Sequence, residues 1–213
     1  MPMLPPVVTI GGQKEEVGAG DVSFEHIFDP RVLTDDITGD VPNGFVLRPL
    51  RIQDYDNGFL DLLAQLTTVG EVTRDAFEDQ FKRMSKITPQ AYYIVVIEDL
   101  SNKRVVGTAT LVIEWKFIHD AGSRGRVEDV VVDKDVRGRK MGALLNRTLV
   151  ALAKQIGVYK LSLECKDSLI PFYELHGYRK DIGNNFLVQR FDKDMLEVEI
   201  PRNNEESLGP RNP

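Results

Sequence analysis

A strand that leads into a basic, glycine-containing turn and then into a helix most restricts how this chain can fold. The strand is predicted over Arg126–Val132, where valine is the commonest residue. The turn follows at Arg137–Gly142, with the sequence RGRKMG, and apolar residues recur at helical spacing over Met141–Ile156. Backbone N–H groups at a helix amino terminus are unpaired and carry partial positive charge, so this turn predicts a phosphate-binding loop. Gly138 and Gly142 would let a pyrophosphate approach the backbone closely.

The distribution of charge along the chain favours a local anion-binding site over general binding of nucleic acid. With 27 Lys and Arg against 33 Asp and Glu, the formal net charge is −6, which argues against general nucleic-acid binding. The segment Arg137–Lys160 nevertheless contains several basic residues and neither Asp nor Glu. The alternative interpretation of this segment is a helix with a solvated basic face. We expect no nucleic-acid partner, because interleaved exposed aromatic residues are lacking.

The distribution of proline, glycine and charge divides the chain into three parts. Residues 1–43 hold five of the eleven prolines and are expected to form an extended or partly disordered leader, with 24–33 as a candidate docked piece. Residues 44–191 are expected to be compact, and 192–213 to form an acidic mobile tail. Within 44–191 the patterns predict a strand, two helices, three strands, a helix, a strand, a helix and a last strand at 186–191. This order predicts an α+β fold, with a mixed sheet flanked by helices.

Cysteine, histidine and hydropathy restrict the chemistry and the compartment. The single Cys165 excludes an intrachain disulfide and a thiolate zinc cluster, and nothing around it in the sequence indicates a nucleophile. The three His residues are scattered, so we expect no metal site. No apolar run approaches the roughly 18 residues of a membrane helix, so we expect no membrane span. This composition is typical of a reducing, cytoplasmic compartment.

Two motifs resemble those of the GNAT acetyltransferase superfamily. The turn RGRKMG after Val130–Val132 is similar to the superfamily's acyl-CoA pyrophosphate loop. The segment Phe172–Tyr178 is similar to its late helix, which has the pattern F-Y-x-x-x-G-[FY]. A closer resemblance is to the glucosamine-6-phosphate N-acetyltransferase family. It rests on TTVG at 67–70, KFIH at 116–119, GRVEDVVV at 125–132, YKLSLEC at 159–165 and RF at 190–191.

The resemblance covers about 44–191 and implies a fold and an activity. The implied GNAT fold has α/β/α layers, with a mixed, mostly antiparallel sheet whose central parallel strand pair splays apart. The implied reaction is acetyl transfer from acetyl-CoA to the 2-amine of glucosamine 6-phosphate, by direct attack in a ternary complex. Its product, N-acetylglucosamine 6-phosphate, would feed UDP-N-acetylglucosamine synthesis, and the protein would be a homodimer. Alternatives are a GNAT enzyme that acts on another amine, in a protein or a polyamine, and a catalytically silent CoA-binding module.

The resemblance also implies which residues hold acetyl-CoA, without a metal. The amide N–H of Val130 would polarise the thioester carbonyl, and the Tyr173 hydroxyl would assist the departing sulfur. Three positions depart from the usual superfamily pattern: Lys140 replaces a common Gly, Ala143 a common Lys and Leu169 a common Asn. The implied acetyl-CoA residues are Val130, Val131, Val132, Arg137, Gly138, Arg139, Lys140, Met141, Gly142, Ala143 and Tyr173.

Cations and carboxylates would recognise the phosphosugar, because a bound phosphate monoester needs positive charge around it. The resemblance implies a substrate site made of Thr67, Lys116, Phe117, Ile118, His119, Glu128, Asp129, Val130, Tyr159, Lys160 and Arg190. A partner subunit is a candidate source of Tyr159 and Lys160 in this site. Glu128, Asp129 and Glu164 are the catalytic candidates for orienting the amine and taking its proton. For Glu128 and Glu164 the alternative role is a salt bridge with Arg126 or Lys160.

Overall fold

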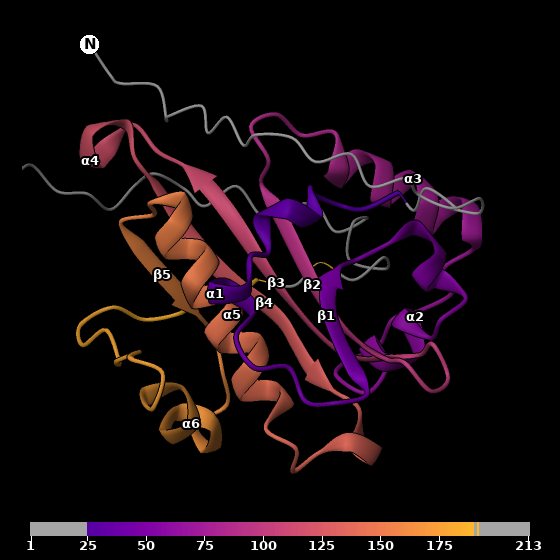
Figure 1. Cartoon of the computed structure of the whole chain (residues 1–213). Helices are drawn as coiled ribbons and strands as arrows, with labels where there is room; N and C mark the ends of the chain where they lie inside the picture. Colours follow the sequence, from indigo (N-terminus) through magenta and orange to yellow (C-terminus); the bar gives the residue numbers. More distant parts are fainter. Residues whose placement is uncertain (1–24, 190, 192–213) are drawn as a thin grey trace, which may run out of the picture. The chain divides into compact units, whose positions relative to one another are not determined.

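The computed structural model describes residues 25–189 and 191, and Figure 1 shows its ribbon. The contacts between residues divide the chain into two compact units, Met1–Tyr178 and Arg179–Pro213. The first unit contains a five-stranded sheet in the order β1-β2-β3-β4-β5, in which only the β4–β5 pair is parallel. The mixed, mostly antiparallel sheet expected from the sequence is therefore confirmed. Its strands are β1 Phe45–Pro49, β2 Tyr92–Asp99, β3 Val105–Trp115, β4 Ser123–Val132 and β5 Lys160–Leu163.

Helical segments connect and cover these strands. The α-helices of the described residues are α1 Asp35–Thr38, α2 Phe59–Leu63, α3 Arg74–Ser85, α4 Ile118–Ala121, α5 Met141–Ile156 and α6 Ile170–Glu174. Short 3₁₀ segments are η1 Pro30–Val32, η2 Ile52–Tyr55, η3 Lys134–Val136 and η4 Asp167–Leu169. Thr73 caps α3 as the sequence predicts, because its hydroxyl accepts the amide N–H of Ala76 at 3.2 Å.

The helices lie on both faces of the sheet, which gives the α/β/α layers. Neighbouring residues of a strand point to opposite faces, and β3 shows where each layer packs. A Cβ on Gly107 would lie 3.4 Å from Leu145 of α5, so this face of β3 contacts α5. Thr108 instead lines a cavity with Phe59 of α2 and Phe77 of α3. The sheet thus separates α5 from α2 and α3.

Helix α5 follows from its sequence pattern. Leu145, Leu149 and Leu152 recur at helical spacing and are fully buried, where α5 contacts β2, β3 and β4. Gly157 ends the helix with φ 82°, a left-handed conformation that costs glycine nothing. Figure 1 shows α5 running along the sheet, with its amino terminus next to the end of β4.

The amino-terminal part differs from the expected extended leader. Ile27, Phe28 and Ile37 are buried in the core of the first unit. The amide of Ile27 donates to the Leu50 carbonyl at 2.9 Å, and the Phe28 ring lies 5.1 Å from the ring of Tyr93. Residues 25–38 therefore belong to the compact unit, because their few apolar side chains pack in the core and Ile27 and Phe28 contact Leu50, directly after β1, and Tyr93 of β2. Residues 1–24 of the predicted leader and the predicted tail, 192–213, lie outside the described residues.

The predicted last strand at 186–191 is not found. Residues 179–189 and 191 have neither helix nor strand, and Arg190 lies outside the described residues. The side chains of Phe186, Leu187 and Val188 are exposed. The alternating apolar residues predicted a strand here. Among the described residues, however, no strand of the five-stranded sheet pairs with this segment.

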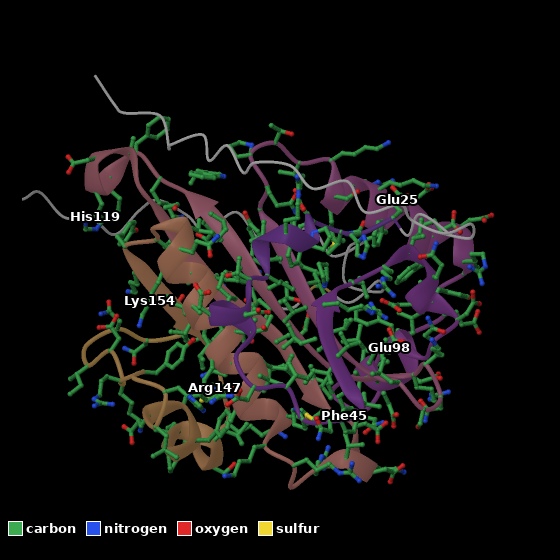
Figure 2. The ribbon with its side chains drawn as sticks, viewed as in Figure 1. Glu25, Phe45, Glu98, His119, Arg147 and Lys154 are labelled. Atoms are coloured by element: carbon green, nitrogen blue, oxygen red, sulfur yellow. The ribbon has the colours of Figure 1, made fainter. Side chains whose placement is uncertain are left out.

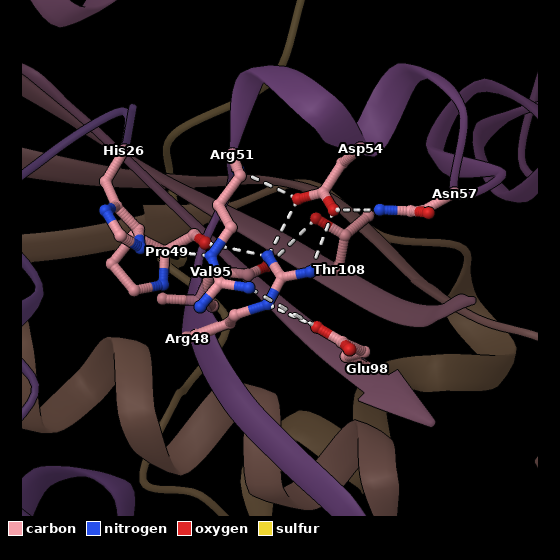
Figure 3. A network of polar contacts seen from close by, with 9 residues as sticks. All are labelled: His26, Arg48, Pro49, Arg51, Asp54, Asn57, Val95, Glu98 and Thr108. Carbon is pink, nitrogen blue, oxygen red and sulfur yellow. Dashed lines mark hydrogen bonds and ion pairs between the residues drawn. The ribbon is translucent and has the colours of Figure 1, made fainter. Parts of the chain in front are cut away.

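A buried ion-pair network joins β1, η2 and β2 (Figure 3). The Arg48 guanidinium donates two hydrogen bonds of 2.8 Å to Asp54 and one of 2.7 Å to Glu98. All three side chains are almost completely buried. Arg51 extends the network, because its Nε donates to Nε2 of His26 at 3.1 Å. The network therefore links the docked segment 25–38 to the sheet.

Candidate active site

Strands β4 and β5 separate part-way along their length. Their parallel pairing runs from Arg124↔Lys160 to Val127↔Leu163. Beyond this point β5 ends, while β4 continues to Val132. Among the described strands, residues 128–132 thus have a partner only on the β3 side. The other edge of this segment presents backbone donors and acceptors that an extended ligand can pair with.

A β-bulge lies at the start of this separated segment. The β3–β4 register shifts between Thr108 and Thr110, so that Asp129 and Val130 together oppose Ala109. Asp129 has φ 52°, a left-handed conformation that Asp tolerates better than most residues. The bulge turns Asp129 toward the α2–α3 face, where it lines a largely apolar cavity of about 280 Å³ with Thr108 and Thr110. Simple strand alternation did not predict this orientation.

The three candidate carboxylates have different surroundings. Glu128 and Glu164 share one cation, since Arg126 lies 2.7 Å from Glu128 and 2.9 Å from Glu164. This is the salt bridge considered as their alternative role. The Asp129 carboxylate has no hydrogen-bond or ion-pair partner among the described residues. Although one side of Asp129 is open to solvent, the surrounding protein desolvates the carboxyl group and, together with the Glu128 charge, raises its pKa.

The turn before α5 forms an open anion cradle. Gly138 and Lys140 have φ 82° and 62°, so the backbone curls around the amino terminus of α5. No side chain caps this end of the helix, and the first turn contains no acidic residue. Gly142 lies at the base of the cradle, where a Cβ would be in ordinary contact with the Phe172 ring at 3.8 Å and with Val132 at 3.9 Å. Free N–H groups and local positive charge suit a pyrophosphate.

The charged residues of the turn take different directions. The Nε of Arg137 donates to the Val132 carbonyl at 3.3 Å, which ties the turn to the end of β4. The guanidinium of Arg139 lies 5.6 Å from the centre of the Phe45 ring, a cation–π contact with β1. Lys140 immediately precedes α5 and is exposed. The structure therefore brings Lys140 to the cradle, whereas Arg139 also packs on the sheet edge.

Tyr173 lies on α6 and is 7% exposed. Its ring contacts those of Phe172 at 5.0 Å and Tyr178 at 5.7 Å between centroids. Burial raises the pKa of Tyr173, and Cys165 adds to this effect. The hydroxyl is thus held protonated as a hydrogen-bond donor. Cys165 itself is exposed, with its side chain reduced.

Lys116 and Arg124 share a glutamate at the far end of the hairpin formed by β3 and β4. Glu114 accepts from Lys116 at 2.6 Å and from Arg124 at 2.9 Å. Hydrogen bonds from Arg124 and then Lys116 lower the pKa of Glu114 to about 2. The two cations leave one net positive charge beside Glu114, which suits a phosphate group on its open side.

The hairpin tip carries the remaining loop residues. The His119 ring stacks on Tyr159 at 4.0 Å between centroids, and His119 has φ 52°. The side chains of Trp115, Phe117 and Ile118 at this tip are exposed, Phe117 completely. Figure 2 labels His119 close to α4, at one end of the sheet. An apolar tip of this kind is typical of a protein contact surface.

The structure does not bring all predicted substrate residues together within one chain. Lys160 pairs with Arg124 at the start of β4, whereas Asp129 lies five residues farther along. At about 3.3 Å per residue, the two ends of this segment are roughly 16 Å apart. Thr67 lies after α2 and is exposed. Lys116, His119, Tyr159 and Lys160 thus form one group, and Asp129 belongs to another.

Comparison with known proteins identifies the family. The profile of the family described as Acetyltransferase (GNAT) family matches residues 58–178, which is more than half of the chain. The chain belongs to this family. The solved structure of glucosamine-6-phosphate N-acetyltransferase from Arabidopsis thaliana superposes with a TM-score of 0.66 at 34% identity, covering 70% of this chain and 99% of that one.

Curated relatives of this GNAT chain are similar over most of their length. The probable glucosamine 6-phosphate N-acetyltransferase of Drosophila melanogaster is 48% identical over 148 residues, which cover 69% of this chain and 67% of the relative. Glucosamine 6-phosphate N-acetyltransferase of Candida albicans is 37% identical over 151 residues, covering 71% and 99%. These matches agree with the resemblance on which the sequence prediction rested.

GNAT acetyltransferases use acetyl-CoA as their co-substrate, and the residues present suit it. The cradle before α5 offers N–H groups for a diphosphate, and the free edge of β4 offers backbone pairing for an amide-containing arm. Within residues 25–189 and 191, no group of three or more His, Cys, Asp or Glu side chains is arranged to hold a metal ion. In the described part of the chain no helix combines the length and the apolar character that crossing a membrane requires.

Proposed function

We propose that the chain transfers the acetyl group of acetyl-CoA to the 2-amine of glucosamine 6-phosphate, giving N-acetylglucosamine 6-phosphate and CoA. One structural observation carries this proposal: the parallel pairing stops at Val127↔Leu163, directly before the Asp129 bulge. The relatives named above supply the substrate class. The product is the acetylated phosphosugar from which UDP-N-acetylglucosamine is made.

The backbone of 128–132 aligns the two reactants. Its free edge pairs with the pantetheine arm, and the diphosphate binds at the cradle formed by Arg137–Gly142. The Val130 N–H donates to the thioester oxygen, where negative charge develops as the amine attacks. Tyr173 stays protonated because burial raises its pKa, so it can donate to the sulfur as the C–S bond breaks. Holding amine and thioester together supplies much of the acceleration.

Asp129 is the best candidate for taking the proton of the amine. Glu128 and Glu164 are both neutralised by Arg126, which makes them weaker bases. The Asp129 carboxylate has no such partner in the described residues, and its raised pKa makes it a better acceptor. We assign Glu128, Glu164 and Arg126 to orientation of the sugar ring.

We further propose that the active unit is a homodimer. The cation group of Lys116, His119, Tyr159 and Lys160 lies roughly 16 Å along β4 from Asp129, which is too far for one small sugar phosphate. In a dimer this group would approach the Asp129 of the partner copy. The exposed Phe117 at the hairpin tip supports such a contact. Since its substrates are charged metabolites that do not cross membranes freely, we place the enzyme in the cytoplasm.

Activity assays with one acceptor at a time test this proposal. Purified protein is incubated with acetyl-CoA and one acceptor, and release of the CoA thiol is followed. We expect turnover with glucosamine 6-phosphate, much weaker turnover with glucosamine, and none with spermidine or a lysine peptide. Turnover of spermidine or the peptide, with glucosamine 6-phosphate untouched, would instead identify a GNAT enzyme for another amine. No thiol release with any acceptor would identify a silent CoA-binding module.

A further inference from the structure

A groove on the outer side of α5 lies outside the site described above. It has a volume of about 250 Å³ and is lined by Arg147, Val150, Ala151, Lys154 and His176. A water molecule occupies roughly 30 Å³ of the liquid, so the groove has room for a small ligand. Its four α5 residues recur at helical spacing and form one face of the helix. Figure 2 labels Arg147 and Lys154 along α5.

The charged groups that line the groove are all basic. In the part of the chain that the structure describes, the side chains of Arg147, Lys154 and His176 have neither an ion pair nor a hydrogen bond. By contrast, Arg124 and Arg126 are both paired with glutamates. The chain has 33 acidic residues against 27 Lys and Arg, so carboxylates are plentiful. Arg147 and Lys154 are thus two exposed cations without an acidic partner among the described residues, and an anion in the groove would supply their counter-charge.

The surroundings of His176 show that its ring lies close to the Arg147 guanidinium. Partial burial and the charge of Arg147 both lower the pKa of His176. The ring of His176 is held against Phe172, with 5.1 Å between centroids. Its backbone N–H also donates to the Tyr173 carbonyl at 2.9 Å. The groove is thus a fixed feature of the α5–α6 surface.

We propose that this groove is a second anion site, which binds the phosphate or pyrophosphate group of a small metabolite. Arginine offers paired donors to phosphate oxygens and lysine adds a compact charge. Val150 and Ala151 between them provide an apolar floor for the carbon part of such a ligand. The proposal goes beyond acetyl transfer and assigns a binding site to α5 residues that the reaction does not use.

The groove is separate from the cradle that precedes α5. Arg147 lies six residues and Lys154 thirteen residues beyond Met141. At 1.5 Å per residue, these distances along the helix are about 9 Å and 20 Å. A single phosphate group cannot contact the cradle and Lys154 at once. The two anion sites should therefore fill independently.

Calorimetric titration with inorganic pyrophosphate tests the second site. The protein is first saturated with CoA, so that the cradle is occupied. We expect one pyrophosphate to bind per chain, and the double variant Arg147→Gln/Lys154→Gln to weaken this binding at least tenfold. Arg83→Gln, which removes an exposed cation of α3, is the matched control and should bind like the wild type. All variants should bind CoA with unchanged affinity and show unchanged thermal unfolding.

Three results would overturn the second site. The CoA-saturated protein could bind no pyrophosphate. Pyrophosphate could displace the bound CoA during the titration, which would make the groove part of the acetyl-CoA site. Arg83→Gln could weaken binding as much as the double variant, which would indicate a general charge effect.

Discussion

Asp129 and Glu128 are neighbours in the sequence, yet their carboxylates have different surroundings. Arg126 neutralises Glu128, whereas Asp129 stands at the bulge without a cation. We expect Asp129→Asn to lower kcat by about 100-fold or more, the range typical of a lost general base. KM for acetyl-CoA should change little, because the variant keeps the backbone of β4. Steady-state kinetics with both substrates check this, and an Asp129→Asn enzyme with wild-type kcat would assign the proton to another group.

Asp129→Asn should lower activity, as argued above, but raise the stability of the fold near neutral pH. A carboxyl group whose pKa is raised on folding holds its proton more tightly in the folded state, so stability falls as the pH rises through that pKa. Asp129→Asn removes this loss, and Asn adopts a φ of 52° readily. By calorimetry we expect a higher Tm than wild type at about pH 7.5 and no advantage at about pH 3.

Asp99→Asn is the control of opposite sign for that experiment. Hydrogen bonds from the Ser101 hydroxyl and amide lower the pKa of Asp99, so its ionised form stabilises the fold. This contribution is present above the unfolded pKa and is lost as the pH falls through the folded pKa. Asp99→Asn should therefore lower Tm at about pH 7.5. Equal shifts in the two variants would contradict the opposite pKa directions.

Tyr173→Phe separates the leaving-group role from packing. The ring contacts with Phe172 and Tyr178 are retained, so thermal stability should stay close to wild type. Loss of the hydroxyl should lower kcat by about 10- to 100-fold, because the departing thiolate loses its donor. KM for acetyl-CoA should stay within about twofold. Unchanged kcat in this variant would show that the sulfur takes its proton from solvent.

At the scale of elements, the Arg48 network holds β1, η2 and β2 together. Arg48→Met leaves Asp54 and Glu98 buried without their cation, and we expect a loss of about 3–5 kcal/mol. Arg104→Met, which breaks an exposed pair with Asp61, should cost less than about 1 kcal/mol. Urea unfolding of both variants measures the difference. Equal losses would mean that burial of the network contributes nothing.

The sequence predicted the elements whose apolar pattern is long. The strand Arg126–Val132, the turn Arg137–Gly142 and helix α5 were predicted close to where they lie, because each combines local propensity with a buried face. The sequence indicated 24–33 only as a candidate docked piece, because two neighbouring apolar residues, Ile27 and Phe28, are too few to show a helical or strand periodicity. The bulge at Asp129 was missed because register depends on the pairing with β3, which one strand does not encode.

Some features of the candidate site could likewise be predicted from local sequence, whereas others depend on how the strands pair. The cradle could be predicted because glycine and basic residues next to a helix start have a local chemical meaning. The sequence placed Lys116, His119, Tyr159 and Lys160 in one substrate site with Asp129, and their distance from Asp129 could not be read from spacing alone. It depends on where β5 stops pairing with β4.

At the scale of the whole molecule, the apolar hairpin tip predicts how two copies meet. Phe117→Ser replaces a completely exposed ring, so it should leave the folded chain intact. We expect this variant to shift from dimer to monomer in light scattering, and turnover to fall with it, because the cation group no longer reaches the partner's site. Leu100→Ser, at an exposed position in the β2–β3 turn, is the control and should remain dimeric. A dimeric, active Phe117→Ser protein would place the interface elsewhere.

A crystal structure of the protein with CoA bound tests the central point most directly. We expect the pantetheine arm between β4 and the end of β5, with a hydrogen bond to the Val130 backbone, the diphosphate on the turn Arg137–Gly142 and the sulfur near the Tyr173 hydroxyl. Strands β4 and β5 paired continuously beyond Val127↔Leu163, or CoA bound away from this turn, would contradict the proposed site.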